Sequence, residues 1–157
     1  MRLTLFNKMR KQEVGRISFL DFKHTVKYDL VDYLTSGMQM AMVLCIDFTR
    51  SNLDQTSPAS LHYHTKNVQS QYYQAIQQVG SIVLEYDTDK LVPCYGFGAK
   101  VNMPNFSSHD YVHNYFPLNG SEENPNLLKM PGIEEGYRNC LPHIKFSGPT
   151  YIVPLLK

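Results

Sequence analysis

The sequence predicts an α/β fold built on a mostly parallel sheet, and three stretches of the chain predict it. Residues 40–46 are an unbroken apolar run between polar residues, which is typical of a strand buried on both faces, although periodicity alone does not exclude a buried helix. Residues 70–86 carry apolar side chains at helical spacing, and residues 91–98 form a second strand-like stretch. Strand, helix and strand in this order predict the crossover connection of a parallel sheet.

Oxygen-bearing side chains follow the first predicted strand. Asp47, Thr49 and Ser51 alternate along the chain directly after the apolar run. In open α/β sheets, ligands bind beyond the carboxyl ends of the strands. One carboxylate and two hydroxyls are hard oxygen ligands that suit Mg²⁺, Mn²⁺ or Ca²⁺. The same residues are also typical of an ordinary turn whose side chains cap the backbone, and their spacing leaves both interpretations open.

Several short motifs in one order resemble the copine domain, which is similar to the von Willebrand factor A domain. The motifs are CIDFTRSN (45–52), SLHY (60–63), YQAIQQVG (73–80), YDTDK (86–90), YGFGA (95–99) and GPT (148–150). The resemblance begins at about residue 28 and implies a doubly wound sheet with flanking helices, truncated at the C-terminus. Because a later strand of that sheet would be missing, we expect the strand at residues 40–46 to have a vacant hydrogen-bonding edge.

The resemblance also implies a fourth metal ligand. A-like domains complete their metal site with a threonine from a second loop, and Thr150 supplies that hydroxyl here. The implied site is therefore Asp47, Thr49, Ser51 and Thr150, holding Mg²⁺ or Mn²⁺. It lacks the second carboxylate that normally comes from a later loop. The first loop has the sequence DFTRSN, where integrin-type domains have DxSxS, and copines share this departure.

Two segments are expected along the chain. Residues 13–22 predict a strand with no partner inside the first forty residues, and they resemble the last strand of the second C2 domain of a copine. Residues 1–27 would then be a C2 remnant plus linker. Residues 28–157 would be an incomplete copine-type A-like domain. The chain would enter this domain through a short turn at residues 28–34.

The remaining elements follow from local patterns. The helix at residues 70–86 should bury one face made of Tyr72, Tyr73, Ile76, Val79, Ile82, Val83 and Tyr86. Pro93 should lie at the start of its strand or on an edge, and Gly96 and Gly98 should serve packing or a turn. Residues 102–126 should form a polar loop that, by the resemblance, carries a short strand. Residues 132–141 should form a helix, and Pro149 should lie in the first turn of another.

Composition excludes several classes of function. The net charge of +1 gives no electrostatic basis for binding nucleic acid. The three cysteines form no CxxC pair, which favours buried thiols in a reducing compartment. His62 and His64 lack a third soft ligand nearby in the sequence, so a structural role for them is favoured over a metal site. No apolar run is long enough to cross a bilayer, and the basic start does not resemble a signal peptide, so we expect a cytoplasmic protein.

The resemblance implies a calcium-dependent phospholipid-binding protein rather than an enzyme. In copines, Ca²⁺ and phospholipid bind through C2 domains, which recruit the protein to the plasma membrane, and the A-like domain recruits cytosolic protein partners through its divalent metal. Two alternatives stay open. The chain is similar over the same domain to a group of RING ubiquitin ligases, although it has no RING-type cysteine and histidine array. It could also be a truncated product without independent activity.

Overall fold

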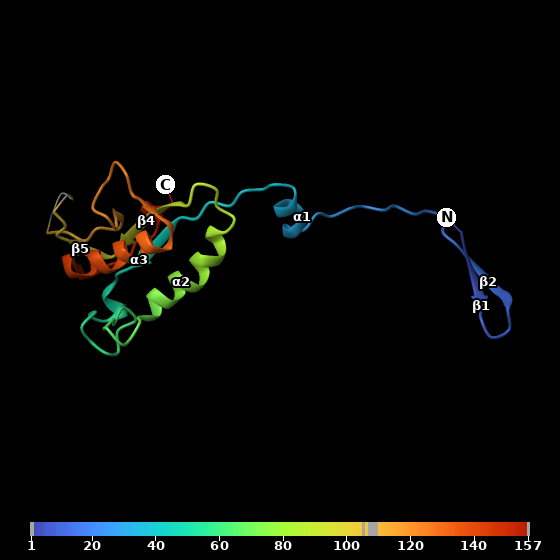
Figure 1. Cartoon of the computed structure of the whole chain (residues 1–157), viewed down its shortest axis with the longest axis horizontal. Helices are drawn as coiled ribbons and strands as arrows, with labels where there is room; N and C mark the ends of the chain where they lie inside the picture. The colour runs from blue at the N-terminus through green and yellow to red at the C-terminus, as the bar shows by residue number, and fades with distance from the viewer. Residues whose placement is uncertain (1, 105, 107–109, 157) are drawn as a thin grey trace. The chain divides into compact units, whose positions relative to one another are not determined.

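The computed structural model describes residues 2–104, 106 and 110–156 (Figure 1). The chain divides into two compact units, Met1–Met38 and Gln39–Lys157. The three helices and the small sheets make it a mixed α/β protein.

The first unit contains a β-hairpin and a short helix. Strand β1 (Arg2–Asn7) pairs antiparallel with β2 (Gln12–Ser18), and α1 spans Leu30–Thr35. The expectation that residues 13–22 have no partner strand is therefore wrong. Residues 2–7 alternate polar and apolar side chains over a short span, and a tight turn brings them back onto β2. Asp29 caps α1 in a capping box with Asp32, so part of the predicted turn at residues 28–34 is helical.

The second unit is organised around β4 (Leu91–Phe97). Strand β3 (Leu44–Asp47) runs parallel to β4, as the crossover predicts. Strands β6 (Phe116–Pro117) and β7 (Asn126–Leu128) pair with β4 in the antiparallel direction. Strand β5 (Ala99–Val101) continues beyond β4 and pairs antiparallel with β8 (Ile144–Phe146). A mostly parallel sheet is thus the wrong description of these residues, since β3 with β4 is the one parallel pair among the strands of the described residues.

The first strand is shorter and more peripheral than its apolar run predicts. Residues 40–43 are not in a strand, and the Met40 N–H donates to the Tyr86 carbonyl at the end of a helix instead of to a neighbouring strand. Within the described residues, β3 pairs only with β4, so it lies at an edge and β4 is central. The predicted vacant edge is present, although on a strand of residues 44–47 and not 40–46. Pro93 lies in β4 just before its pairing with β3 begins at Cys94.

Two helices pack on the sheet and on each other. Helix α2 (Gln71–Leu84) starts at the Ser70 cap, and α3 spans Lys129–Cys140. The helix predicted at residues 132–141 starts three residues later in the sequence than α3 does. Its inward face is confirmed, because Ile133, Tyr137 and Cys140 are buried, as is the following Leu141.

The predicted apolar face of α2 is only partly correct. Tyr73, Ile76, Gly80 and Leu84 are buried, whereas Val79, Ile82 and Tyr86 are exposed. The buried positions follow a narrow stripe at spacings of three and four residues. The sheet beneath α2 is narrow, so nothing in the described part of the chain covers the flank that carries Val79 and Ile82.

Two further details correct the expectations. Pro149 is not in a helix, and the next helical turn is the 3₁₀ segment η3 (Val153–Leu155). All three cysteines are free, but only Cys94 and Cys140 are buried, because Cys45 lies on the exposed face of β3. Strand β6 is the short strand expected within residues 102–126; residues 105 and 107–109 of that loop lie outside the described residues.

Candidate metal centre

The loop after β3 brings three of the four predicted ligands together. The Asp47 Oδ1 accepts a hydrogen bond from the Thr49 N–H at 2.7 Å, and the Thr49 Oγ1 lies 3.0 Å from the Ser51 Oγ. Thr49 is almost fully buried, whereas Ser51 is exposed and lies in the middle of the short 3₁₀ segment η1 (Arg50–Asn52). The Asp47 carboxylate is thus fixed against the Thr49 backbone and the two hydroxyls contact each other, so the loop at the carboxyl end of the parallel strand pair is rich in side-chain oxygens.

A second backbone segment, which leads to Thr150, is attached to this loop. Thr49 and Ser147 form a parallel β-bridge, and the Arg50 N–H donates to the Ser147 carbonyl at 2.7 Å. Thr150 follows Ser147 by three residues and is exposed. Among the described residues, no hydrogen bond joins Thr150 to the other three predicted ligands. The fold thus brings the second loop beside the first, while the metal site itself stays a prediction.

The donor set fits a hard divalent cation that prefers oxygen ligands, and not a metal that needs thiolate or imidazole ligands. The candidate ligands are one carboxylate and hydroxyls, which are the oxygen ligands that Mg²⁺, Mn²⁺ and Ca²⁺ prefer. Within residues 2–104, 106 and 110–156, no group of three histidine, cysteine, aspartate or glutamate side chains could hold a metal. An ion at Asp47 would therefore depend on hydroxyl and water oxygens for the rest of its coordination.

Gly98 packs directly against Thr49 in the loop after β3. It has a positive φ of 79°, and a Cβ built on it would lie 2.3 Å from the Thr49 Cγ2 and 3.2 Å from the Thr49 backbone. Only glycine permits both this backbone conformation and this close approach. The packing and turn role predicted for this glycine is confirmed, and it serves directly the loop that carries the candidate ligands.

His62 fixes the backbone of the same loop through a hydrogen bond to Asp47. Its Nε2 lies 2.8 Å from the Asp47 carbonyl oxygen, and because a carbonyl only accepts, Nε2 donates. Its Nδ1 then accepts from the Tyr137 hydroxyl at 2.9 Å, and that hydroxyl in turn lies 3.1 Å from the Ser70 Oγ. The Asn52 side-chain amide donates to the same Asp47 carbonyl at 3.0 Å. This chain of hydrogen bonds connects both helices to the backbone of Asp47.

The His62 ring is also clamped between aromatic rings. It stacks on Tyr72 with centroids 4.0 Å apart and on Phe48 at 5.1 Å, and Phe146 meets its edge at 4.9 Å. Burial lowers the pKa of His62 to about 4, because the buried site disfavours the imidazolium. His62 is therefore neutral at pH 7. Both of its nitrogens already have partners, so the structural role predicted for the SLHY motif is confirmed.

Sequence reasoning missed most of this support. Tyr137 and Ser70 are 75 and 67 positions away from their partners in the chain, so no local pattern connects them to the loop. Asn52 was visible as the end of the CIDFTRSN motif, but the sequence does not show that its amide nitrogen donates to the Asp47 carbonyl. The available signal was His62 in the SLHY motif, which together with His64 has no third soft ligand nearby in the sequence.

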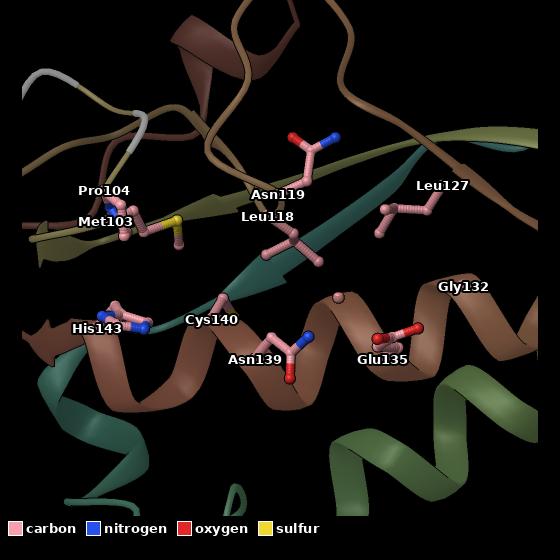
Figure 2. A pocket seen from close by; sticks show the side chains of 11 residues that line it. Met103, Pro104, Leu118, Asn119, Leu127, Gly132, Glu135, Asn139, Cys140 and His143 are labelled. Carbon is pink, nitrogen blue, oxygen red and sulfur yellow. The ribbon is translucent and has the colours of Figure 1, made fainter.

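A separate cavity lies along α3. It has a volume of about 330 Å³ and an apolar floor that includes Leu118, Leu127 and Cys140. Figure 2 shows Glu135 and Asn139 on α3 along one side and Asn119 on the other. The candidate ligands do not line this cavity. In the part of the chain that the structure describes, no helix has the length and apolar character needed to span a bilayer.

The class of protein follows from these features: an α/β domain with a parallel strand pair and an oxygen-rich loop at its carboxyl end. The family model for the copine domain, described as Copine, matches residues 60–157, which is more than half of the chain. The chain belongs to the copine family. The matched residues include His62, Tyr137 and Thr150, while Asp47, Thr49 and Ser51 lie just before them.

Proposed function

We propose that this chain acts as a binding module of a copine-type protein, whose von Willebrand A-like domain holds a divalent cation and recruits cytosolic protein partners. The observation that carries the proposal is the oxygen cluster of Asp47, Thr49 and Ser51 at the carboxyl end of the parallel strands. The carboxyl edge is where ligands bind in open α/β sheets. The family membership supports the same function.

The cation would be Mg²⁺ or Mn²⁺, held by Asp47, Thr49, Ser51 and Thr150. With a single carboxylate the site would bind weakly, with an affinity around millimolar, and the ion would keep several waters. One of these water positions is open to a carboxylate from a protein partner. The domain's role is recruitment, and no catalytic step is assigned to it.

The wider function proposed is calcium-dependent binding to phospholipid. In this proposal the C2 domains of the full-length family bind Ca²⁺ and bring a cytoplasmic protein to the plasma membrane. The hairpin β1–β2 belongs to the segment interpreted as a C2 remnant. The A-like domain then supplies the protein-binding half of the molecule.

Calorimetric titration with Mg²⁺, Mn²⁺ and Ca²⁺ tests the metal site. Asp47→Ala removes the carboxylate and should abolish binding. Asp47→Asn is the sharper variant, because an amide oxygen can still accept from the Thr49 N–H and keep the turn while the charge is lost. It should also lose binding.

Two controls separate the metal site from a general effect. Glu85→Gln removes one negative charge from the exposed end of α2, and His64→Ala removes an imidazole outside the oxygen cluster. Both should bind as the unmodified chain does. Metal binding that survives Asp47→Asn, or that His64→Ala removes, contradicts the proposed site and leaves Asp47 as a turn cap alone.

A further inference from the structure

A basic cavity lies beside the loop that follows β3. It has a volume of about 560 Å³. Its walls carry three cations, Arg50, Lys100 and Lys145, with one acid and two apolar side chains, Asp54, Leu53 and Phe146. The predicted metal ligands do not line it, although Arg50 lies between two of them in the sequence.

Two of the cations face each other across a strand pair. Lys100 in β5 and Lys145 in β8 are register partners in an antiparallel ladder, so their side chains leave the same face of the sheet. Like charges directly opposite each other destabilise a strand pair. Lys100 is compensated by Asp110, whose carboxylate lies 2.6 Å from its ammonium nitrogen. Lys145 has no ion pair among the described residues.

The third cation is held close to this pair by the backbone. The Arg50 N–H donates to the Ser147 carbonyl at 2.7 Å, two residues after Lys145. Arg50 also has no ion pair within the described part of the chain. Asp54 is ionised, because its Oδ1 accepts from the N–H and the hydroxyl of Thr56, which hold the pKa of that carboxyl below its usual range. Its single negative charge offsets one of the three cations in the wall. The cavity therefore has an excess of positive charge.

We propose that this cavity binds an acidic peptide segment of a partner protein. Its carboxylates pair with Arg50 and Lys145, and an apolar side chain of the segment packs on Phe146. Charge complementarity selects an anionic ligand, and the concave shape with an apolar wall fits a peptide better than the flat surface of a membrane. The net charge of +1 also supplies no long-range attraction to an anionic lipid surface. This binding needs no metal, so it goes beyond the function proposed above.

Fluorescence anisotropy with a labelled acidic peptide tests the inference. The probe is the acetylated hexapeptide of sequence ELEELE, and its uncharged analogue QLQQLQ is the matched control, both in EDTA and 50 mM salt. Only the acidic peptide should bind saturably. Arg50→Gln and Lys145→Gln should each weaken binding by about two- to fivefold, as expected for one solvent-accessible ion pair. Lys66→Gln removes one positive charge from an exposed loop elsewhere and should leave binding unchanged.

Several outcomes would overturn the inference. These are an absence of acidic-peptide binding, equal binding of the uncharged peptide, or an equal loss in Lys66→Gln. Phosphatidylserine vesicles that bind through Arg50 and Lys145, while the peptide does not, would assign the cavity to a membrane instead. Asp47→Asn should keep peptide binding in EDTA. A failure of metal binding therefore leaves this inference standing, and a failure of peptide binding leaves the proposed metal site standing.

Discussion

His62 donates a hydrogen bond from Nε2 to the carbonyl oxygen of Asp47, with the two atoms 2.8 Å apart. The two residues are fifteen positions apart, and the bond fixes the backbone at the residue proposed to bind the metal. Because Nε2 must carry the proton, Nδ1 must accept, and Tyr137 provides the hydroxyl that donates to it. The bond from Tyr137 to Nδ1 thus requires the neutral form of His62, because the imidazolium has no acceptor nitrogen.

Acid should destabilise the chain through His62. The pKa of His62 is lowered from 6.5 to about 4, so the unfolded state takes up a proton at a higher pH than the folded state. The stabilisation is complete above pH 6.5 and is lost as the pH falls towards 4, by about 3 kcal/mol in all. Urea unfolding followed by circular dichroism in EDTA, at pH 7 and pH 4.5, measures this difference. His62→Gln should show a smaller difference, and an equal one contradicts the assignment.

Tyr137→Phe should destabilise the folded state and loosen the loop. The change removes one oxygen, so the His62 Nδ1 loses its donor and the Ser70 hydroxyl loses its acceptor, although the Ser70 Oγ still accepts from the Tyr73 N–H. Leaving buried polar groups unpaired costs about 1–3 kcal/mol in the free energy of unfolding. Tyr63→Phe is the matched control, since its hydroxyl makes no described hydrogen bond. Urea denaturation should show equal stability for Tyr63→Phe and the unmodified chain, and a similar loss in both variants contradicts the prediction.

Gly98→Ala should disturb the loop after β3 more than an alanine elsewhere. The new methyl group would meet Thr49 and would force an alanine into a positive φ, at a cost of about 1–3 kcal/mol. Gly132→Ala in α3 is the control. Its Cβ would make only ordinary contacts, the nearest at 3.7 Å, and alanine favours helix, so its stability should equal or exceed that of the unmodified chain. Thermal denaturation compares the two variants, and an equal stability refutes the role given to Gly98.

The free edge of β3 should make the isolated chain self-associate. Among the described residues, β3 has a partner on one side alone, and an unpaired strand edge is a template for another chain. Val43→Lys adds a charge beside this edge and should shift the chain towards monomer. Val79→Lys on α2 is the matched control, because Val43 and Val79 are both 59% exposed. It should not shift the chain towards monomer. Sedimentation velocity over a range of concentrations gives the result, and a monomer at every concentration in the unmodified chain would refute the idea.

The three thiols should differ in reactivity. Cys45 is exposed, whereas Cys94 and Cys140 are buried. Burial also raises the pKa of Cys94 to about 12 and that of Cys140 further still, which suppresses the reactive thiolates. Maleimide at pH 8 should label one thiol per folded chain and all three in urea, as mass spectrometry can count. Rapid labelling of Cys94 in the folded chain would contradict the packing of β4.

The sequence alone determined the local elements and the family. Hydrophobic spacing is a local signal, so α2, α3 and β4 were predicted close to their true bounds. The ordered motifs identified the copine family. The hydrogen bonds between Asp47 and Thr49 and between Thr49 and Ser51 are local too, because these residues are close neighbours in the chain, while their role as metal ligands stays a prediction.

Tertiary structure decided which of these elements is central and what supports the loop. An apolar run predicts a buried strand over residues 40–46, but burial depends on what packs against it. Here Met40 bonds to Tyr86 just beyond α2, Val43 and Cys45 stay exposed, and β4 takes the centre of the sheet. The flank of α2 that carries Val79 and Ile82 is exposed for a related reason. A side chain is buried only where another element packs against it, and the spacing of apolar residues does not show where that happens. The bond between His62 and Asp47 depends on Tyr137, 75 residues further along, and only folding brings that hydroxyl to the imidazole.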